Sequence, residues 1–595
     1  MIVSFNVDYR TNWGESVYLT AEIPQLGKGN HAKALKMELY GEQSWKATIE
    51  LPDDTPDFTY SYFVRHENGY EKDEWGHGHH FHKGEGVKSY EIFDRWQDQP
   101  WDKPFYSVVF TDCVCRRENR ALFPEVTPGT LLLSCDAPMV APDEVVAVSG
   151  SSDALGNWDP EKAVVMADTY FPTWACVLPL AGLDEKVEFK FLILKKDTRK
   201  VVCWEGCDNR NMVVDPATKG ENMVVAGMRF VNPKAPWRGA GVAIPVFSLR
   251  SEQDFGVGEF LDIKLMVDWA AKTGQRFIQL LPVNDTTMTH TWTDSYPYNA
   301  NSAFALHPMY LHLPALGRLS DPARQEYYDN LGRELNALPQ IDYERVNEGK
   351  NAFTRELFAE IGVKEVKTAS FKAFVKENAS WLTPYAAFCV LRDRNGSADF
   401  TKWGEFATYD QEAVTKFVKE NKEDINYVYW IQYHLDKQMR EARDYAHAHG
   451  VAIKGDIPIG ISRTSVDAWL SPRLFNLDCQ AGAPPDDFSV LGQNWGFPTY
   501  NWDMMEKDNF SWWKKRFRKL EDYFDSFRID HILGFFRIWE VPSEYVQGLC
   551  GHFNPALPLT PNEIEQYGLD FNEARLTTPH INREFLPELF GDQTE

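Results

Sequence analysis

Apolar and polar residues alternate in short runs along the first 220 or so residues of the chain. Alternation of period two is typical of strands with one buried face and one solvated face. Turn residues separate the runs, of which four clear examples are Val17–Thr20, Trp45–Leu51, Thr59–Val64 and Glu188–Leu194. The pattern predicts an all-β architecture for this part of the chain.

This part of the chain also repeats itself at an offset of 129 residues. The matched positions are Leu26-Gly27 with Leu155-Gly156, Trp45 with Trp174, Tyr60 and Tyr62 with Phe189 and Phe191, and Trp75 with Trp204. Five coincidences at one offset indicate two copies of one β-sandwich module. We place the copies at 1–95 and 128–218, with linkers at 96–127 and 219–236. We expect the mid-strand tryptophans Trp45 and Trp174 to be core residues.

From about residue 237 the pattern changes to strands that alternate with helices. Apolar runs predict strands at Gly241–Phe247, Phe277–Val283, Val451–Ile459 and Ser526–Leu533, and helical spacing predicts helices at Phe260–Lys272 and Tyr427–His449. Apolar strands joined by helices favour a parallel sheet with helices outside, hence a barrel or a doubly wound fold. The segment 312–426 is rich in Lys, Glu and Ala, and we interpret it as a helical insertion.

Composition and charge narrow the class of protein. A chain of 595 residues with 43% hydrophobic and 25% charged residues is globular, and its net charge of −25 argues against nucleic acid or an anionic membrane as a partner. The first residues lack a basic region followed by an apolar run, and no apolar stretch approaches the length of a spanning helix. We therefore expect a soluble, cytoplasmic protein. The nine cysteines are irregularly spaced, which favours reduced thiols over a metal site.

Charged residues lie inside two of the predicted parallel strands. Lys454 and Asp456 belong to KGDIP, and Arg528 and Asp530 belong to RIDH. Because side chains two apart in a strand share a face, each pair lies on one side of the sheet. Charges inside apolar strands are paired or functional, and these fragments alone leave both alternatives open. Chemistry in such folds is expected at the carboxyl ends of the strands.

Aromatic residues make up 14% of the chain, with 20 tryptophans, which suits either sugar recognition or a large aromatic core. The second module contains LGNW, FKF and WEGCDNR and resembles the family 20 starch-binding modules. The resemblance implies that Trp158 and Trp204 stack on consecutive α-glucose units while Lys190 hydrogen-bonds their hydroxyls. We add Asn209 as a further hydroxyl partner.

The first module departs from this pattern at three of the four positions. The offset places Gly29, Ser61 and His80 where the second module has Trp158, Lys190 and Asn209, and only Trp75 matches a binding residue, Trp204. A site with one ring and no cation is expected to bind weakly. We expect the second module to dominate starch binding.

Longer motifs in the second half resemble glycoside hydrolase family 77, the 4-α-glucanotransferases (amylomaltases or disproportionating enzymes). They are GVAIPVFSLRSEQDFGVGEF, SYPYNANSAFA, GDIPIGISRTSVDAWLSPRLFNLD, PPDDFSVLGQNWGFPTYNW and FRIDHILGFFRIWEVP. The resemblance implies a (β/α)8-barrel (TIM barrel) over 237–595 that transfers glucosyl units between α-1,4-glucans such as maltose, malto-oligosaccharides, glycogen or starch, without a cofactor or a metal. Two starch-binding modules and an insertion resemble the longer, maltose-using branch of the family.

The resemblance also implies roles for individual residues. Asp530 is the nucleophile that forms a covalent β-glucosyl-enzyme, and Arg528 keeps it ionised. Asp456 and His531 hydrogen-bond the sugar. The remaining substrate-binding positions are Gln493 and Trp495 in the loop after the third strand, Tyr298, which would stack near the same sugar, and Tyr296, where the family usually has Ser.

Two catalytic motifs of this family are missing from the chain. Retaining chemistry requires a second carboxyl group as general acid/base, which the family supplies from GEDLG, and a third Asp comes from an HD motif. The sequence contains no GEDLG, and none of its 15 histidines is followed by Asp. With four barrel strands, we expect the first half of a barrel from a longer enzyme, inactive by itself. The alternative is a catalytically incomplete protein that only binds glycogen or starch.

Overall fold

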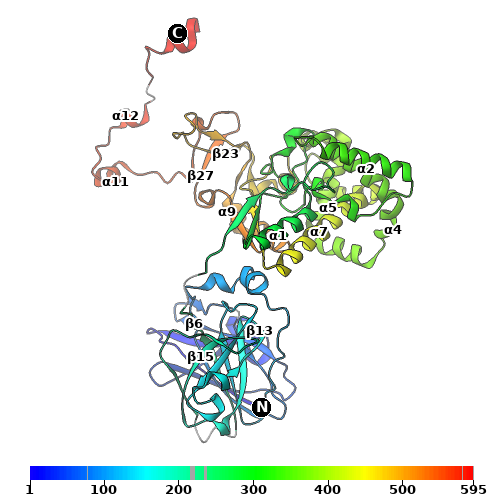
Figure 1. Cartoon of the computed structure of the whole chain (residues 1–595). Helices are drawn as coiled ribbons and strands as arrows, with labels where there is room; N and C mark the ends of the chain where they lie inside the picture. Colours follow the sequence, from blue (N-terminus) through cyan, green and yellow to red (C-terminus); the bar gives the residue numbers. More distant parts are fainter. Residues whose placement is uncertain (77, 215–220, 234–236, 579–580, 594–595) are drawn as a thin grey trace.

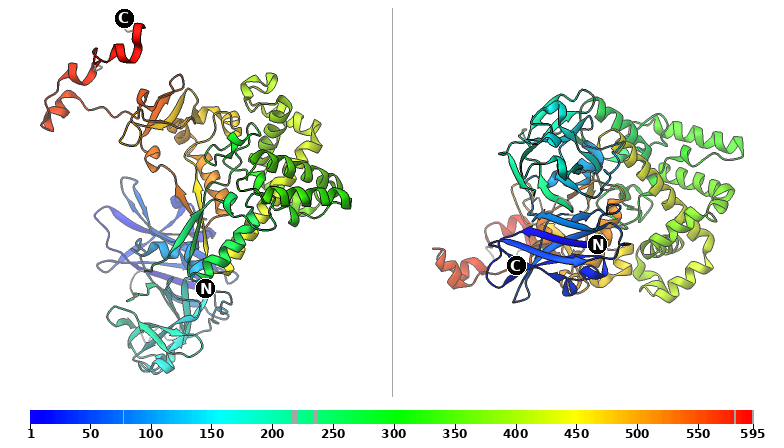
Figure 2. Two further views of the ribbon diagram at one scale, coloured as in Figure 1. Left: turned by 45° about the horizontal axis from the view of Figure 1, so that its top comes forward. Right: turned by 90° about the horizontal axis from the view of Figure 1, so that it is seen from below.

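The computed structural model describes residues 1–76, 78–214, 221–233, 237–578 and 581–593. Two β-rich modules lie side by side at one end of the molecule, and an α/β unit with a helical subdomain lies at the other (Figures 1 and 2). No helix in the described ranges is long and apolar enough to cross a membrane.

The two β-rich modules have equivalent strands and cores. The main strands of the first are β1 (Ile2–Asp8), β2 (Glu15–Ala21), β5 (Ser44–Glu50), β6 (Phe58–His66) and β9 (Ser89–Arg95). Those of the second are β10 (Thr130–Asp136), β11 (Glu144–Gly150), β14 (Thr173–Pro179), β15 (Lys186–Lys195), β16 (Val201–Trp204) and β17 (Arg210–Val213). Strands β2 and β11, like β5 and β14, begin 129 residues apart, which agrees with the predicted repeat. Trp45 and Trp174 are 5% and 0% exposed, so their prediction as core residues is confirmed.

One continuous sheet joins the two modules. Its strand order is β13-β14-β10-β18-β9-β1-β5-β4, with the short strands β13 (Ala167–Tyr170) and β4 (Glu38–Tyr40) at its ends. Strand β18 (Asn222–Arg229) pairs in parallel with β10 on one side and with β9 on the other.

The predicted linker at 219–236 is therefore wrong, because most of its described residues form the strand β18. Met223 packs into the core of the second module and Val224 into the core of the first. Neighbouring residues of a strand point to opposite faces of the sheet, so β18 contributes to both cores.

The segment between the modules connects them to the α/β unit. It contains a 3-10 helix η3 (Lys103–Tyr106) and a π-helix η4 (Val109–Val114). Phe105 and Phe110 form a small apolar cluster with Ala452 of the α/β sheet, and Trp237 and Phe277 pack against that cluster. Burial of these side chains fixes the segment against the α/β unit.

The α/β unit is built on four parallel strands in the order β19-β20-β21-β26. They are β19 (Gly241–Ile244), β20 (Phe277–Leu280), β21 (Ala452–Ile457) and β26 (Ser526–Ile529). Helices α1 (Ile263–Lys272) and α7 (Lys422–Ala448) pack on the sheet, in agreement with the predicted alternation. The segment between β20 and β21 is helical as predicted, with α2 (Pro322–Asn336), α3 (Tyr343–Leu357), α5 (Ala369–Asn395) and α6 (Gln411–Glu420).

The fourth strand is shorter than its predicted range of Ser526–Leu533. It ends at Ile529, and His531 has a left-handed backbone (φ 51°) that starts a 3-10 turn over Ile532–Phe535. The apolar run Ile532-Leu533 that extended the prediction is largely exposed on this turn. Asp530 therefore follows the strand instead of lying within it.

A second, antiparallel sheet and three helices follow β21. The sheet has the order β24-β23-β27-β28, formed by β23 (Cys479–Ala483), β24 (Gln493–Asn494), β27 (Ile538–Pro542) and β28 (His552–Asn554). The helices are α8 (Val466–Leu470), α9 (Trp502–Lys507) and α10 (Ser511–Glu521). Beyond β28, an exposed segment with short helices α11 (Pro561–Gln566), α12 (Glu573–Thr577) and α13 (Leu586–Phe590) extends away from the sheet (Figure 1).

Candidate active site at the ends of the parallel strands

Three charged side chains meet at the carboxyl ends of β21 and β26. Asp456 and Arg528 are register partners in the parallel pair. Arg528 Nη1 donates to both carboxylate oxygens of Asp456 (2.9 and 2.7 Å), and its Nη2 donates to Asp530 Oδ1 (2.7 Å). The side chain of Asp456 is fully buried, whereas that of Asp530 is 27% exposed. Arg528 thus holds one carboxylate that solvent can reach and one that it cannot.

Tyr298 joins this group from the loop after β20. Its hydroxyl donates to Asp456 Oδ2 (2.8 Å). The sequence prediction was a stacking role, and the hydrogen bond to Asp456 was missed, because it joins residues that are far apart along the chain. Two hydrogen bonds attach the Tyr298 loop to the segment after β21. Val466 N donates to Asn301 O (3.0 Å), and Ala303 N donates to Asp467 Oδ2 (2.8 Å).

Burial sets the protonation preferences of the site. It raises the pKa of Asp456, although the hydrogen bond from Tyr298 and the charge of Arg528 oppose the shift. Burial also raises the pKa of Tyr298, and the hydrogen bond with Asp456 adds to this shift. Burial lowers the pKa of His531 although Asp530 opposes it, which favours a neutral imidazole beside the carboxylate.

Aromatic side chains lie close to Asp530 and to its neighbour His531. Trp495 contacts His531 edge to face, with ring centroids 5.0 Å apart, and its Nε1 donates to Gln493 Oε1 (3.0 Å). Tyr296 is 55% exposed and lies 5.6 Å from the ring of Tyr298. The structure brings all eight residues predicted from the family 77 motifs to one end of the α/β sheet.

Left-handed backbone at His531 marks this turn as a special position. Residues other than glycine with a positive φ are uncommon, and they cluster at functional sites where surrounding structure enforces them. The conformation places the imidazole against Trp495, and a Cβ at Gly534 would meet the same ring at 3.1 Å. The turn therefore fixes His531 next to Asp530.

A second candidate site lies on the second starch-binding module. Trp158 and Trp204 have ring centroids 6.4 Å apart, inclined at 47° to each other. Trp204 is the register partner of Leu192, and Lys190, two residues from Leu192, lies on the same face of the sheet. Asn209 is exposed, and its side chain donates to Glu188 Oε2 (3.3 Å). Two tilted indoles with a cation nearby form a platform for a bent chain of sugar rings.

The corresponding tryptophan of the first module has different surroundings. Trp75 contacts Tyr106 edge to face at 5.2 Å, and the guanidinium of Arg229 lies 5.7 Å from its ring centroid. These partners come from η3 and from β18. Trp75 thus packs at the junction of the two modules, and no second tryptophan in the described part of the chain forms a pair with it.

Two groups of His, Cys, Asp and Glu side chains are close enough to hold a metal ion. They are Cys113, His447 and Asp525, and Asp254, Glu259 and His312. Hydrogen bonds already join His447 to Asp525 (2.6 Å) and His312 to Glu259 (2.6 Å), and Glu259 is also paired with Lys350. We call Asp456, Arg528, Asp530 and the residues around them, Tyr296, Tyr298, Gln493, Trp495 and His531, the Asp530 site. Within the described residues, neither group includes a member of this site.

Comparison with known families identifies the class of protein. A family profile described as 4-alpha-glucanotransferase, glycoside hydrolase family 77, matches residues 244–579. A profile described as starch binding domain matches residues 1–90 and 131–224, which confirms the two modules expected from the repeat. The chain belongs to the 4-alpha-glucanotransferase family, glycoside hydrolase family 77.

Two curated relatives agree with this assignment. The 4-alpha-glucanotransferase DPE2 of Oryza sativa subsp. japonica is 38% identical over 613 residues, covering 99% of this chain and 64% of the relative. The 4-alpha-glucanotransferase of Chlamydia caviae is 35% identical over 300 residues, covering 50% of this chain and 56% of the relative. The chain spans less than two thirds of the length of each. A solved amylomaltase from Streptococcus agalactiae, in complex with acarbose, is 29% identical with a TM-score of 0.47 and covers 56% of this chain and 68% of its own.

Proposed function

We propose that this chain provides the nucleophile of a retaining 4-α-glucanotransferase. The Asp530 carboxylate forms a C–O bond to the anomeric carbon of an α-1,4-glucan as the glycosidic C–O bond breaks, and a general acid protonates the leaving oxygen. The acceptor hydroxyl then attacks the β-glycosyl ester, gives its proton back to that group and releases the Asp530 carboxylate. The observation that carries the proposal is the Asp456–Arg528–Asp530 group at the carboxyl ends of two adjacent parallel strands, in the region that matches the family profile. In this proposal β19, β20, β21 and β26 are four strands of a (β/α)8-barrel.

The geometry gives each side chain of this group a separate task. The positive charge of Arg528, 2.7 Å from Asp530, favours the ionised form that a nucleophile requires. Asp456 and Tyr298 fix Arg528 from the buried side, so Asp530 alone presents a solvent-accessible carboxylate. Retaining chemistry also requires a second carboxyl group as general acid/base, and none of the family motifs found in this sequence supplies it.

Aromatic surroundings support transfer over hydrolysis. The acceptor must reach the glycosyl ester before water does, and rings that pack on a sugar face favour the sugar. Trp495, His531 and the exposed Tyr296 are the side chains placed for this task. We propose α-1,4-glucans as substrates, with maltose and malto-oligosaccharides at Asp530 and glycogen or starch held by the second module.

An α-maltosyl fluoride tests the role of Asp530 directly. Its fluoride leaves with the bonding electron pair and needs no proton from a general acid, so the first half-reaction depends on the nucleophile. The Asp530 carboxylate forms the new C–O bond as the C–F bond breaks. We expect peptide mass spectrometry of the denatured chain to find one maltosyl ester, on the peptide that contains Asp530.

Asp530→Asn should form no adduct, and Arg528→Lys should form it more slowly because a point charge replaces a planar pair of donors. Asp522→Asn, at a carboxylate outside the site, is the matched control and should leave the yield unchanged. An adduct on another carboxylate, or equal yields with Asp530→Asn, would show that the nucleophile is assigned wrongly.

A further inference from the structure

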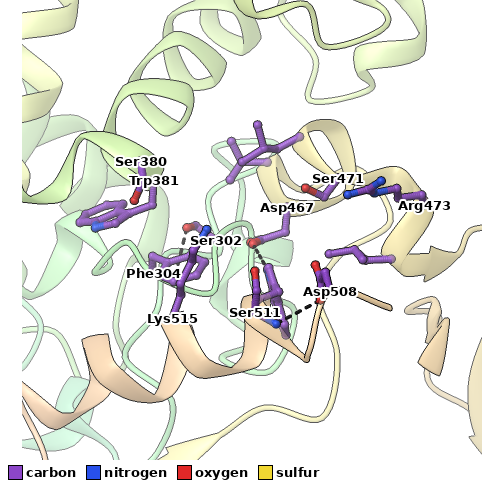
Figure 3. A pocket seen from close by; sticks show the side chains of 14 residues that line it. Ser302, Phe304, Ser380, Trp381, Asp467, Ser471, Arg473, Asp508, Ser511 and Lys515 are labelled. Atoms are coloured by element: carbon purple, nitrogen blue, oxygen red, sulfur yellow. Dashed lines mark hydrogen bonds between the residues drawn. The ribbon is translucent and has the colours of Figure 1, made fainter. Parts of the chain in front are cut away.

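A pocket separate from the Asp530 site lies between the insertion helix α5 and the helices α8 and α10 (Figure 3). Its volume is about 220 Å³, and no residue of the Asp530 site lines it. Pockets for drug-sized ligands measure about 300–1,000 Å³, so this one suits a single small ring. Its floor includes Asp467, the side chain that fastens the Tyr298 loop.

Aromatic rings form one wall of the pocket. Phe304 and Trp381 stack with centroids 6.3 Å apart and planes 16° apart, and Trp512 meets Phe304 edge to face at 6.4 Å. The indole Nε1 of Trp512 donates to Asp467 Oδ1 (2.9 Å), which fixes the ring. Such a wall is suited to the apolar face of a ring-shaped ligand.

Polar side chains without a partner also line the pocket. Among the residues that the structure describes, the exposed side chains of Arg473 and Lys515 have neither a hydrogen bond nor an ion pair, and the hydroxyls of Ser471 and Ser511 have no hydrogen-bond partner. Figure 3 shows Ser471 and Arg473 on the side of the pocket away from Trp381, and Lys515 beside Phe304. The 3-10 helix η17 (Pro472–Leu474) carries Arg473. The pocket therefore combines several free donors with an aromatic wall.

Charge balance indicates a neutral ligand. The lining holds two cations, Arg473 and Lys515, and two carboxyl groups, Asp467 and Asp508, although burial raises the pKa of Asp467. Asp508 accepts from the backbone N–H of Ser511 (3.1 Å) at the start of α10, the place where an anion would otherwise bind. Free donors and acceptors side by side suit hydroxyl groups, which act as both.

We propose that this pocket is a second saccharide site, which takes one hexopyranose unit such as glucose or the end of an α-glucan chain. The sugar ring packs on Trp381 and Phe304, while its hydroxyls bind Arg473, Lys515 and Asp508. The choice of glucose among neutral hexoses rests on the proposed function, whereas the preference for a neutral sugar rests on the lining itself.

Fluorine NMR of the full chain labelled with 5-fluorotryptophan tests this site in solution. The signal that disappears in Trp381→Phe is assigned to Trp381, and glucose, maltose or inorganic phosphate is then titrated. We expect glucose and maltose to shift the Trp381 signal saturably, and phosphate to leave it in place. The double variant Arg473→Ala/Lys515→Ala should weaken glucose binding at this signal at least fivefold.

Matched controls separate the pocket from general effects. Lys514→Ala/Arg518→Ala removes two exposed cations of the same helix that do not line the pocket, and it should leave the titration unchanged. Asp530→Asn should also leave the titration of the Trp381 signal unchanged. The proposal for the pocket therefore does not depend on whether Asp530 is the nucleophile. Any one of three results would overturn the proposal: the Trp381 signal does not shift with glucose, it shifts with phosphate alone, or glucose shifts it equally in the chain with and without the Arg473→Ala/Lys515→Ala substitutions.

Discussion

The two starch-binding modules share a backbone but carry different side chains at the same turn. In the first, Lys28 and Gly29 have φ of 54° and 70°, and in the second, Asn157 and Trp158 have φ of 50° and 63°. In both modules the backbone N–H of the second of these residues donates to a carbonyl of the preceding strand. Gly29 N donates to Ala21 O (2.8 Å), and Trp158 N donates to Gly150 O (2.9 Å). The left-handed conformation costs glycine little and other residues about 1–3 kcal/mol.

This difference supports the proposal that the second module carries the stronger starch-binding site. In the second module Trp158 adopts this unfavourable conformation, and its ring lies beside that of Trp204. In the first module Gly29 occupies this position and supplies no ring, and the carboxylate of the exposed, flexible Glu22 side chain lies where a Cβ would be. Strain that brings two rings together is consistent with selection for ligand binding in the second module alone.

Removal of both rings from the second module should give the largest effect. Each tryptophan contributes roughly 1 kcal/mol of stacking, so Trp158→Ala/Trp204→Ala should weaken starch binding by about 30-fold. Affinity electrophoresis through starch gels measures the loss as recovered mobility. Retention of more than half of the affinity would show that another surface binds starch.

The sequence predicts much of the fold of the two modules and less of the geometry around Asp530. The repeat, the core tryptophans and the parallel strands could be predicted, because spacing of apolar residues within a segment determines them. The shared sheet could not be, because β18 pairs with strands that are far away in the sequence, and the spacing of residues within one segment does not show which strands will pair. The hydrogen bond from Tyr298 to Asp456 was missed for the same reason, whereas the family motifs identified both residues.

A second difference between the modules concerns the buried cation in each. The first module has His79 between Glu74 (3.1 Å) and Asp94 (3.3 Å), and the second has Arg210 on Glu205 (2.7 Å). Burial disfavours the charged imidazole, but the charges of Asp94 and Glu74 outweigh it and raise the pKa of His79 well above 6.5. Arginine stays protonated throughout the same range.

The first module should therefore lose stability in alkali before the second does. A group whose pKa is raised on folding stabilises fully below its unfolded value, near 6.5, and this contribution is lost as the pH rises through the folded value. Hydrogen exchange of β6 and β15 peptides between pH 6 and pH 9, corrected for intrinsic rates, measures both modules in one chain. We expect several-fold more opening of β6 at the higher pH.

His79→Gln is the variant that checks the cause. It removes the titrating cation, so the pH dependence of β6 exchange should disappear, at the cost of lower stability at pH 6. Glu50→Gln, at an exposed carboxylate of the same module, should keep the pH dependence. If β6 and β15 respond equally to pH in the unmodified chain, the shared sheet makes the two modules unfold as one and the distinction between their cations has no consequence.

Loss of the cation at the sugar platform should have a smaller effect. Lys190 lies on the same sheet face as Trp204, and the first module has Ser61 at this position. Lys190→Met keeps the apolar stem and removes one hydrogen bond of about 1 kcal/mol, so starch affinity should fall about fivefold. Isothermal titration with a soluble malto-oligosaccharide measures the change. Lys186→Met, an exposed lysine on the same strand, should change it little.

Trp75→Ala should have the smallest effect on binding, although it removes the tryptophan that corresponds to Trp204. Its ring packs against Tyr106 and Arg229 at the junction of the modules and has no second indole beside it. Starch affinity should change less than about twofold, because one ring without a partner contributes little stacking. Circular dichroism should show that the variant is folded before gel mobility is compared. Equal losses of affinity in Trp75→Ala and Trp204→Ala would mean that both modules bind starch, and that the strained turn at Trp158 does not mark the stronger site.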